Sequence, residues 1–198
     1  MNFNPTKQYI ERLETAVSDG DIDLIEDIMS TLHNADISEL FDVLSPVDSR
    51  TIVDLLIPND AADVIVNMEE DSRENLLKYF TAIELASFVM HLDSDDAVDL
   101  LQELSIRKRE EVIAHISDTE LGMHIVDLLY YDDDCAGGLM AKELIKADVN
   151  WTVKQCIEEI RRQTQKVDKI HTVYVVDSQD FLIGRVSLKE IILAKDTT

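Results

Sequence analysis

The stretch FVMHLDSDDAVDLLQEL, residues 88–104, contains the pattern that decides the fold. Its apolar side chains form two groups with identical internal spacing, twelve residues apart: Phe88, Val89 and Leu92, then Leu100, Leu101 and Leu104. Positions i, i+1 and i+4 share one face of an α-helix, the face that a short helix buries against its neighbours. The pattern therefore predicts one short helix in every twelve residues.

The same pattern extends in both directions from this stretch. The last apolar position of each group recurs in steps of twelve from Leu32 to Leu128, which gives nine positions. Each has two partner positions, four and three residues earlier, so the pattern comprises 27 sites. Of these 27 sites 26 are apolar, whereas about 12 are expected by chance in a chain that is 45% hydrophobic. The exception is His124 in the last unit, and a terminal repeat often differs because it faces solvent or another module.

The residues between the apolar groups favour turns and helix starts. They include Ser45-Pro46, Pro58-Asn59-Asp60, Glu69-Glu70-Asp71, Asp93-Ser94-Asp95 and Ser117-Asp118. Ser, Asp and Asn side chains accept hydrogen bonds from the free N–H groups of a following helix. We expect helices of about nine residues and turns of about three, stacked as an α-solenoid with 24 residues per hairpin, because such short helices are unstable alone.

Charge divides the chain into two modules. Residues 1–134 contain 32 acidic and 8 basic side chains, a net charge of −24, whereas residues 135–198 contain 9 and 10, a net charge of +1. The step coincides with Asp132-Asp133-Asp134 and then Gly137-Gly138. We predict a boundary near residue 132, with domains at 1–131 and 132–198.

The second module has the pattern of a small mixed domain. We predict a strand over 143–149, a helix that Thr152 caps and that ends near Gln163, a buried strand over 172–176, a turn, a strand over 181–186, and a helix that Ser187 caps. The order is β-α-β-β-α, with the helices on one face of the sheet. The expected fold class is α+β, an α-solenoid followed by this module, which is too small to be stable without a partner over its open side.

Composition excludes several classes of function. The net charge of −23 argues against binding to nucleic acid or to an anionic membrane surface, and no apolar run is long enough for a membrane span. Cys135 and Cys156 lack metal-type spacing and fit a reduced compartment. No nucleophile stands in a motif with a base, so we expect a soluble cytosolic protein that is not an enzyme.

Two parts of the sequence resemble a known family. Trp151-Thr152-Val153, the strand 171–177, Phe181-Leu182-Ile183-Gly184 and the segment 186–192 resemble a single CBS motif. The segment YYDDDCAGGLM, residues 130–140, resembles the linker into the CBS region of MgtE-type magnesium transporters, and the repeats resemble the MgtE N-terminal superhelical domain. The family continues into a second CBS motif and a membrane channel, which are absent from these residues.

The resemblance implies candidate Mg²⁺ ligands. Asp95 and Asp99, four residues apart, match an acidic motif that ligates Mg²⁺ between the superhelix and the CBS region, with Val98 where the family usually has Ala. Asp63 stands where the family usually has Glu, and the backbone carbonyl at Gly137 or Gly138 is a further candidate. Mg²⁺ prefers such oxygen ligands.

The function implied is a cytosolic Mg²⁺-sensing regulatory region that closes the pore of an MgtE-like transporter at high intracellular Mg²⁺. The implied cofactor is Mg²⁺, and the implied partners are the membrane channel portion of the same transporter and a second copy, paired through the CBS motif at the cytoplasmic face of the membrane. Two alternatives stay open. One is a nucleotide-responsive CBS module; the other is a protein-interaction scaffold, because similar superhelical repeats occur in flagellar motor switch proteins.

Overall fold

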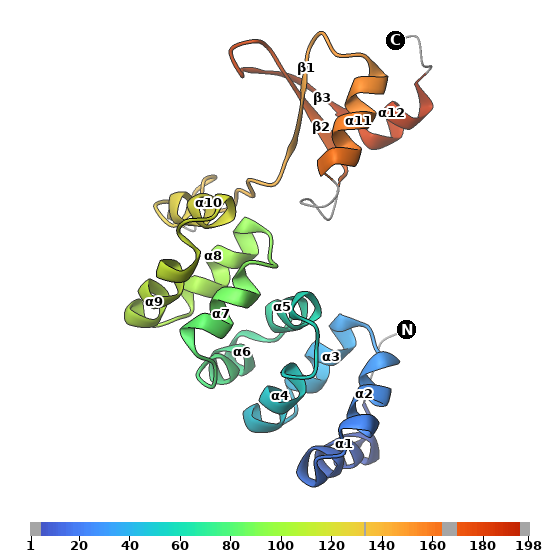
Figure 1. Cartoon of the computed structure of the whole chain (residues 1–198), viewed down its shortest axis with the longest axis vertical. Helices are drawn as coiled ribbons and strands as arrows, with labels where there is room; N and C mark the ends of the chain where they lie inside the picture. Colours follow the sequence, from blue (N-terminus) through green and yellow to red (C-terminus); the bar gives the residue numbers. More distant parts are fainter. Residues whose placement is uncertain (1–4, 133, 164–169, 195–198) are drawn as a thin grey trace. The chain divides into compact units, whose positions relative to one another are not determined.

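A computed structural model describes residues 5–132, 134–163 and 170–194 of the chain. It consists of two compact units, residues 1–140 and 141–198, coloured from blue to yellow and from orange to red in Figure 1. By their internal contacts, the two units divide after Met140. The domain boundary that the sequence suggests near residue 132 stays a prediction. Among the described helices, none is long and apolar enough to cross a membrane.

The first unit is built from short helices at regular intervals. From α2 to α9, each helix begins twelve residues after the one before it, which confirms the predicted repeat. The bounds are α1 Lys7–Asp19, α2 Ile22–Ser30, α3 Asn34–Phe41, α4 Pro46–Val53, α5 Pro58–Val66, α6 Glu70–Leu77, α7 Ala82–Val89, α8 Ser94–Gln102, α9 Ile106–Ile116 and α10 Glu120–Leu128.

Most of the helix contacts in this unit join a helix to the second one along the chain. α3, α5, α7 and α9 contact one another in sequence, as do α4 with α6 and α8 with α10, so one hairpin of 24 residues adds one layer. The repeat positions form the continuous core: all are buried except Leu32, Leu56 and Ile113, which pack partly buried against it, and the half-buried His124. The predicted α-solenoid is confirmed, and its stability comes from this shared core.

Helix starts follow the predicted capping chemistry with some differences. Ser45, Thr81 and Ser105 each accept a hydrogen bond from the backbone N–H three residues later. α5 begins instead with Pro58 at its first position, where the missing N–H costs nothing. The predicted cap at Ser117-Asp118 is wrong by one or two residues, because α9 extends to Ile116 and Thr119 caps α10.

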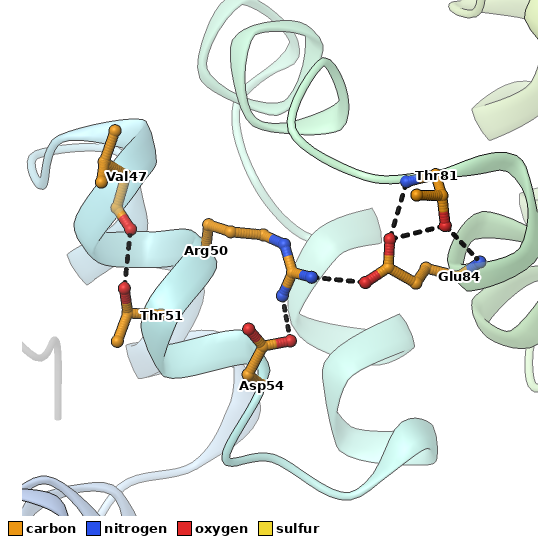
Figure 2. Close-up of polar contacts among 6 residues, drawn as sticks. All are labelled: Val47, Arg50, Thr51, Asp54, Thr81 and Glu84. Carbon is orange, nitrogen blue, oxygen red and sulfur yellow. Dashed lines mark hydrogen bonds and ion pairs between the residues drawn. The ribbon is translucent and has the colours of Figure 1, made fainter.

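Arg50 connects two layers of this unit. Its guanidinium donates to Asp54 at the end of the same helix, α4, and to Glu84 on α7, as Figure 2 shows. Thr81 donates to the same Glu84 carboxylate through its backbone N–H and its hydroxyl, both at 2.7 Å. The Arg50 guanidinium carbon also lies 4.4 Å from the centroid of the Phe80 ring, a cation–π contact.

The second unit has the predicted β-α-β-β-α order. Its elements are β1 Ile145–Asp148, α11 Val153–Gln163, β2 Thr172–Val176, β3 Leu182–Ser187 and α12 Leu188–Leu193. The sheet order is β1-β2-β3, with β1 parallel and β3 antiparallel to β2. The α+β fold class and the predicted elements are therefore confirmed.

The helices cover one face of this sheet. Ile145, Val173 and Val186 are partners across the three strands and belong to the core beneath α11 and α12. The next row along the strands, Lys146, Tyr174 and Arg185, is exposed. The expectation that the strand 172–176 is buried as a whole is wrong, since within this unit only one of its faces is covered.

Candidate functional site

Three carboxylates meet at the start of α8. Asp93 is the N-cap residue, Asp95 and Asp96 lie in the first turn, and one oxygen from each lies within 4.8 Å of the others. The sequence pattern singled out Asp95 but not its two neighbours, although the run Asp93-Ser94-Asp95-Asp96 at a helix start indicates convergence. Only a folded first turn brings an N-cap carboxylate toward the residues that follow it.

The carboxylate of Asp95 contains a buried oxygen. Its Oδ1 atom has no hydrogen-bond partner among the described residues and is shielded from solvent, although the residue as a whole is half-buried. A buried carboxylate oxygen without a partner is costly, so a cation or an ordered water is favoured there. The positive end of the α8 dipole stabilises the anionic carboxylates, and it weakens the binding of a cation there by a modest amount.

These groups fit a hard divalent cation. Mg²⁺ takes oxygen ligands, keeps several of its waters, and usually needs only one or two carboxylates. The three convergent carboxylates provide this donor set.

Asp99 lies one helical turn beyond Asp95 on α8 and is exposed. Because the two aspartates are four residues apart on one helix, they lie on the same face, as the sequence predicted. Within the described part of the chain, the group of convergent carboxylates comprises Asp93, Asp95 and Asp96 and does not include Asp99. Asp99 is instead close enough to Arg73 on α6 to raise the pKa of that arginine, behind the larger effect of its hydrogen bond to Glu103.

Asp63 lies on α5 with a different neighbour. Its Oδ2 accepts a hydrogen bond of 3.2 Å from the side-chain amide of Asn34, and the same amide donates to Oδ1 of Asp60 at 3.3 Å. Asn34 is the first residue of α3, which packs against α5. The amide thus joins two carboxylates, and it was not identified from the sequence.

Gly138 belongs to the turn segment after α10. Its backbone N–H donates to the carbonyl oxygen of Cys135 at 3.1 Å, and Gly137 before it lies against the ring of Tyr131. Its role as a carbonyl ligand stays a prediction, as do the roles of Asp63, Asp95 and Asp99.

The second unit contains a shallow hollow beside the start of α12. It has a volume of about 450 Å³ and is lined by Ile170, His171, Ser187, Leu188, Lys189, Ile192 and Leu193. The wall is mainly apolar; His171, Ser187 and Lys189 provide its polar groups, and Lys189 its basic one. Ser187 is also the N-cap of α12, as predicted, and exchanges hydrogen bonds with Glu190 in a capping box.

Comparisons with known families agree with this architecture. Residues 32–134 match the MgtE intracellular N domain, and residues 136–196 match the CBS domain. The magnesium transporter MgtE of Thermus thermophilus is 27% identical over 190 residues, covering 94% of this chain and 42% of the transporter. MgtE of Enterococcus faecalis is 28% identical over 194 residues, covering 97% and 42% respectively. The chain thus spans about two fifths of the length of these curated relatives.

Solved structures show the same likeness. The crystal structure of the cytosolic domain of the Mg²⁺ channel MgtE in complex with ATP superposes with a TM-score of 0.83 at 26% identity, covering 94% of this chain and 76% of that one. The crystal structure of the soluble part of a magnesium transporter gives a TM-score of 0.80 at 25% identity, covering 94% and 73%. The family model for the N domain covers more than half of the residues. This chain therefore belongs to the MgtE family, with an MgtE intracellular N domain followed by a CBS domain.

Proposed function

We propose that this chain is the cytosolic regulatory region of an MgtE-type magnesium transporter, and that it senses Mg²⁺ through carboxylates of its helical unit. The observation that carries the proposal is the convergence of Asp93, Asp95 and Asp96 within 4.8 Å at the start of α8, together with the buried Oδ1 of Asp95. Asp99 on the same helix and Asp63 on α5 are the further proposed ligands, with the Gly138 carbonyl as a backbone contribution.

The mechanism follows from charge. The helical module has a net charge of −24, so it repels acidic neighbours and its own acidic surfaces. Divalent ions bound at these carboxylates reduce that repulsion and favour a compact arrangement of the regulatory region. A ligand that binds only the compact state stabilises it by about 2.7 kcal/mol at a hundredfold excess over its Kd. In the complete transporter, this shift at high cytosolic Mg²⁺ closes the pore.

Small-angle scattering with and without millimolar Mg²⁺ tests the proposal. We expect the radius of gyration to fall when Mg²⁺ is added, and the double variant Asp95→Asn/Asp99→Asn to weaken this change. The matched control is Asp23→Asn/Asp27→Asn, which removes the same charge at the same spacing from the exposed face of α2. A wild-type radius that does not respond to Mg²⁺, or two double variants that respond equally, would contradict the proposal and favour a scaffold without a sensing role.

A response to nucleotide is the second candidate function. The solved relative that binds ATP includes a region similar to this chain. The hollow lined by His171, Ser187 and Lys189 supplies a basic group for a phosphate and an apolar wall for a base. Calorimetry with ATP and with AMP tests this role: heat that Lys189→Ala abolishes supports it, and no heat from the wild type contradicts it.

A further inference from the structure

Arg73 on α6 holds together the two helices that carry the proposed ligands. Its Nε donates to both carboxylate oxygens of Glu103, at 2.9 and 3.0 Å, and its Nη2 donates to the same carboxylate. Glu103 is the C-cap residue of α8, the helix that contains Asp95 and Asp99. The Arg73 and Glu103 side chains are 16% and 15% exposed, so the pair is largely shielded from solvent.

The other side of the same guanidinium faces the end of α5. Nη1 donates to the carbonyl oxygens of Val66, at 2.6 Å, and Met68, at 3.2 Å. Val66 is the last residue of α5, the helix that contains Asp63. A cation at the C-terminal carbonyls of a helix is favourable, so these bonds hold the charge of Arg73 in place.

The position of this charge has an electrostatic consequence. Asp99 and Glu103 are four residues apart on α8 and therefore share a face, the face that Arg73 contacts. Hydrogen bonding to Glu103 raises the pKa of Arg73, and the charges of Glu70 and Asp99 add to this effect against the opposing effect of burial. The guanidinium therefore stays positive and partly neutralises the face of α8 on which Asp99 lies.

We propose that Arg73 is a fixed internal counter-ion that sets the divalent-cation affinity of the α8 carboxylates. By reducing their negative potential, it keeps Mg²⁺ binding weak enough to respond to changes in concentration. The inference rests on the proposed function and adds to it the residue that tunes the site. Arg73 acts through the field at Asp99 and is not itself a ligand.

A pair of variants separates charge from structure. Arg73→Lys and Arg73→Gln both lose the forked contact with Glu103, but they differ by one positive charge. If the charge sets the affinity, Arg73→Gln binds Mg²⁺ about three- to tenfold more tightly than Arg73→Lys at low salt. The difference shrinks at high salt, because mobile ions screen the field. The readout is the dissociation constant for Mg²⁺, fitted to the rise of the melting temperature of the full chain with Mg²⁺ concentration.

A second pair keeps the test valid if Arg73→Gln does not fold. Arg73→Gln/Glu103→Gln leaves no carboxylate without its partner, and Arg73→Lys/Glu103→Gln differs from it by the same single charge. The expected order of affinities is unchanged. Equal affinities within a folded pair, or tighter binding by the lysine member, would overturn the role of Arg73 while leaving Mg²⁺ binding intact. A wild-type chain that does not bind Mg²⁺ would overturn the proposed function and this inference together.

Discussion

The ring of Tyr131 lies against the backbone of Gly137, so that a Cβ added at residue 137 would be 2.3 Å from Cδ1 of the ring. This contact folds the segment after α10 back on itself. Hydrogen bonds from the backbone N–H of Cys135 to Asp132, and from that of Gly138 to Cys135, both at 3.1 Å, complete the turn. The Ala-Gly-Gly segment therefore forms part of a hydrogen-bonded turn against the Tyr131 ring within the first unit.

Gly137→Ala should loosen this turn. The new methyl group forces the Tyr131 ring away, at an expected cost of about 1 kcal/mol, because the half-exposed ring has space to move. Hydrogen exchange of residues 134–140 should become faster while that of α1–α7 stays the same. Gly122→Ala is the contrast: its Cβ would meet the Ile116 carbonyl oxygen at 1.9 Å, so we expect a larger loss, about 3 kcal/mol. Equal costs for the two variants would contradict this interpretation.

Two buried serines should respond in opposite ways to the loss of the hydroxyl. Ser38 and Ser49 are each 1% exposed, but the Ser38 hydroxyl contacts the carbonyl oxygens of Asn34 and Val64, both at 2.9 Å. The Ser49 hydroxyl has no partner among the described residues. Ser38→Ala should lower the free energy of unfolding by about 1 kcal/mol, whereas Ser49→Ala should leave it unchanged or raise it. Urea denaturation of both variants measures the difference, and an equal loss in both would show that an ordered water satisfies Ser49.

Glu84 should make the helical unit sensitive to acid. Two hydrogen bonds from Thr81, from its backbone N–H and then from its hydroxyl, lower the pKa of Glu84 from the usual 4.5; burial opposes them, and the charges of Arg50 and Lys108 add a smaller lowering. A carboxyl group with a lowered pKa stabilises the folded state above its unfolded pKa, and this stabilisation is lost as the pH falls through the folded pKa.

Thermal melts between pH 6 and pH 3 measure this dependence. Below about pH 4.5, the wild type should lose stability more steeply than Glu84→Gln, which has no charge to lose. Glu110→Gln is the control, because it removes the same charge from an exposed position. Parallel slopes for Glu84→Gln and the wild type would show that other groups determine the acid response.

Apolar side chains on α12 should mediate pairing of two copies. Ile192 and Leu193 are 68% and 71% exposed, which is unusual for adjacent large apolar residues. Ile192→Glu/Leu193→Glu should therefore be monomeric under conditions where the wild type is a dimer in analytical ultracentrifugation. Ile106→Glu on α9, where the isoleucine is 73% exposed, should keep the wild-type mass. A wild type that sediments as a monomer, or a dimer that survives the double change, would refute pairing through this surface.

The helical fold could be predicted from the sequence because the repeat is almost unbroken. One apolar spacing fixed the positions of the helices, since every unit buries the same stripe. The first helix, Lys7–Asp19, only partly follows the predicted repeat: Ala16 and Val17 stand twelve residues before Ile28 and Met29, but the third apolar position is replaced by Gly20, the C-cap residue at which the helix ends. The start of α10 also differs from the prediction, because α9, with 11 residues, is longer than α2–α8, which have eight or nine.

The candidate site was predicted less completely. The resemblance to the MgtE family identified Asp95 and Asp99, which share one face of a helix, but the convergence of Asp93 with Asp95 and Asp96 depends on the geometry of a single turn. The contact of Arg73 with Glu103 spans 30 residues and depends on the rotamers of two long side chains. The periodicity of apolar residues contains no information about such contacts. It shows which face of a helix is buried, but not where the charged end of a long side chain lies.

The regular interval between helix starts determines how the array can change in length. Because most helix contacts join a helix to the second one along the chain, insertion or deletion of 24 residues at a turn adds or removes one layer and preserves the remaining interfaces. An insertion of one residue inside a helix instead rotates everything after it by about 100°, which carries the apolar stripe away from its neighbours. The reach of this domain can therefore be altered by duplication in whole hairpins, whereas small insertions are tolerated only between helices.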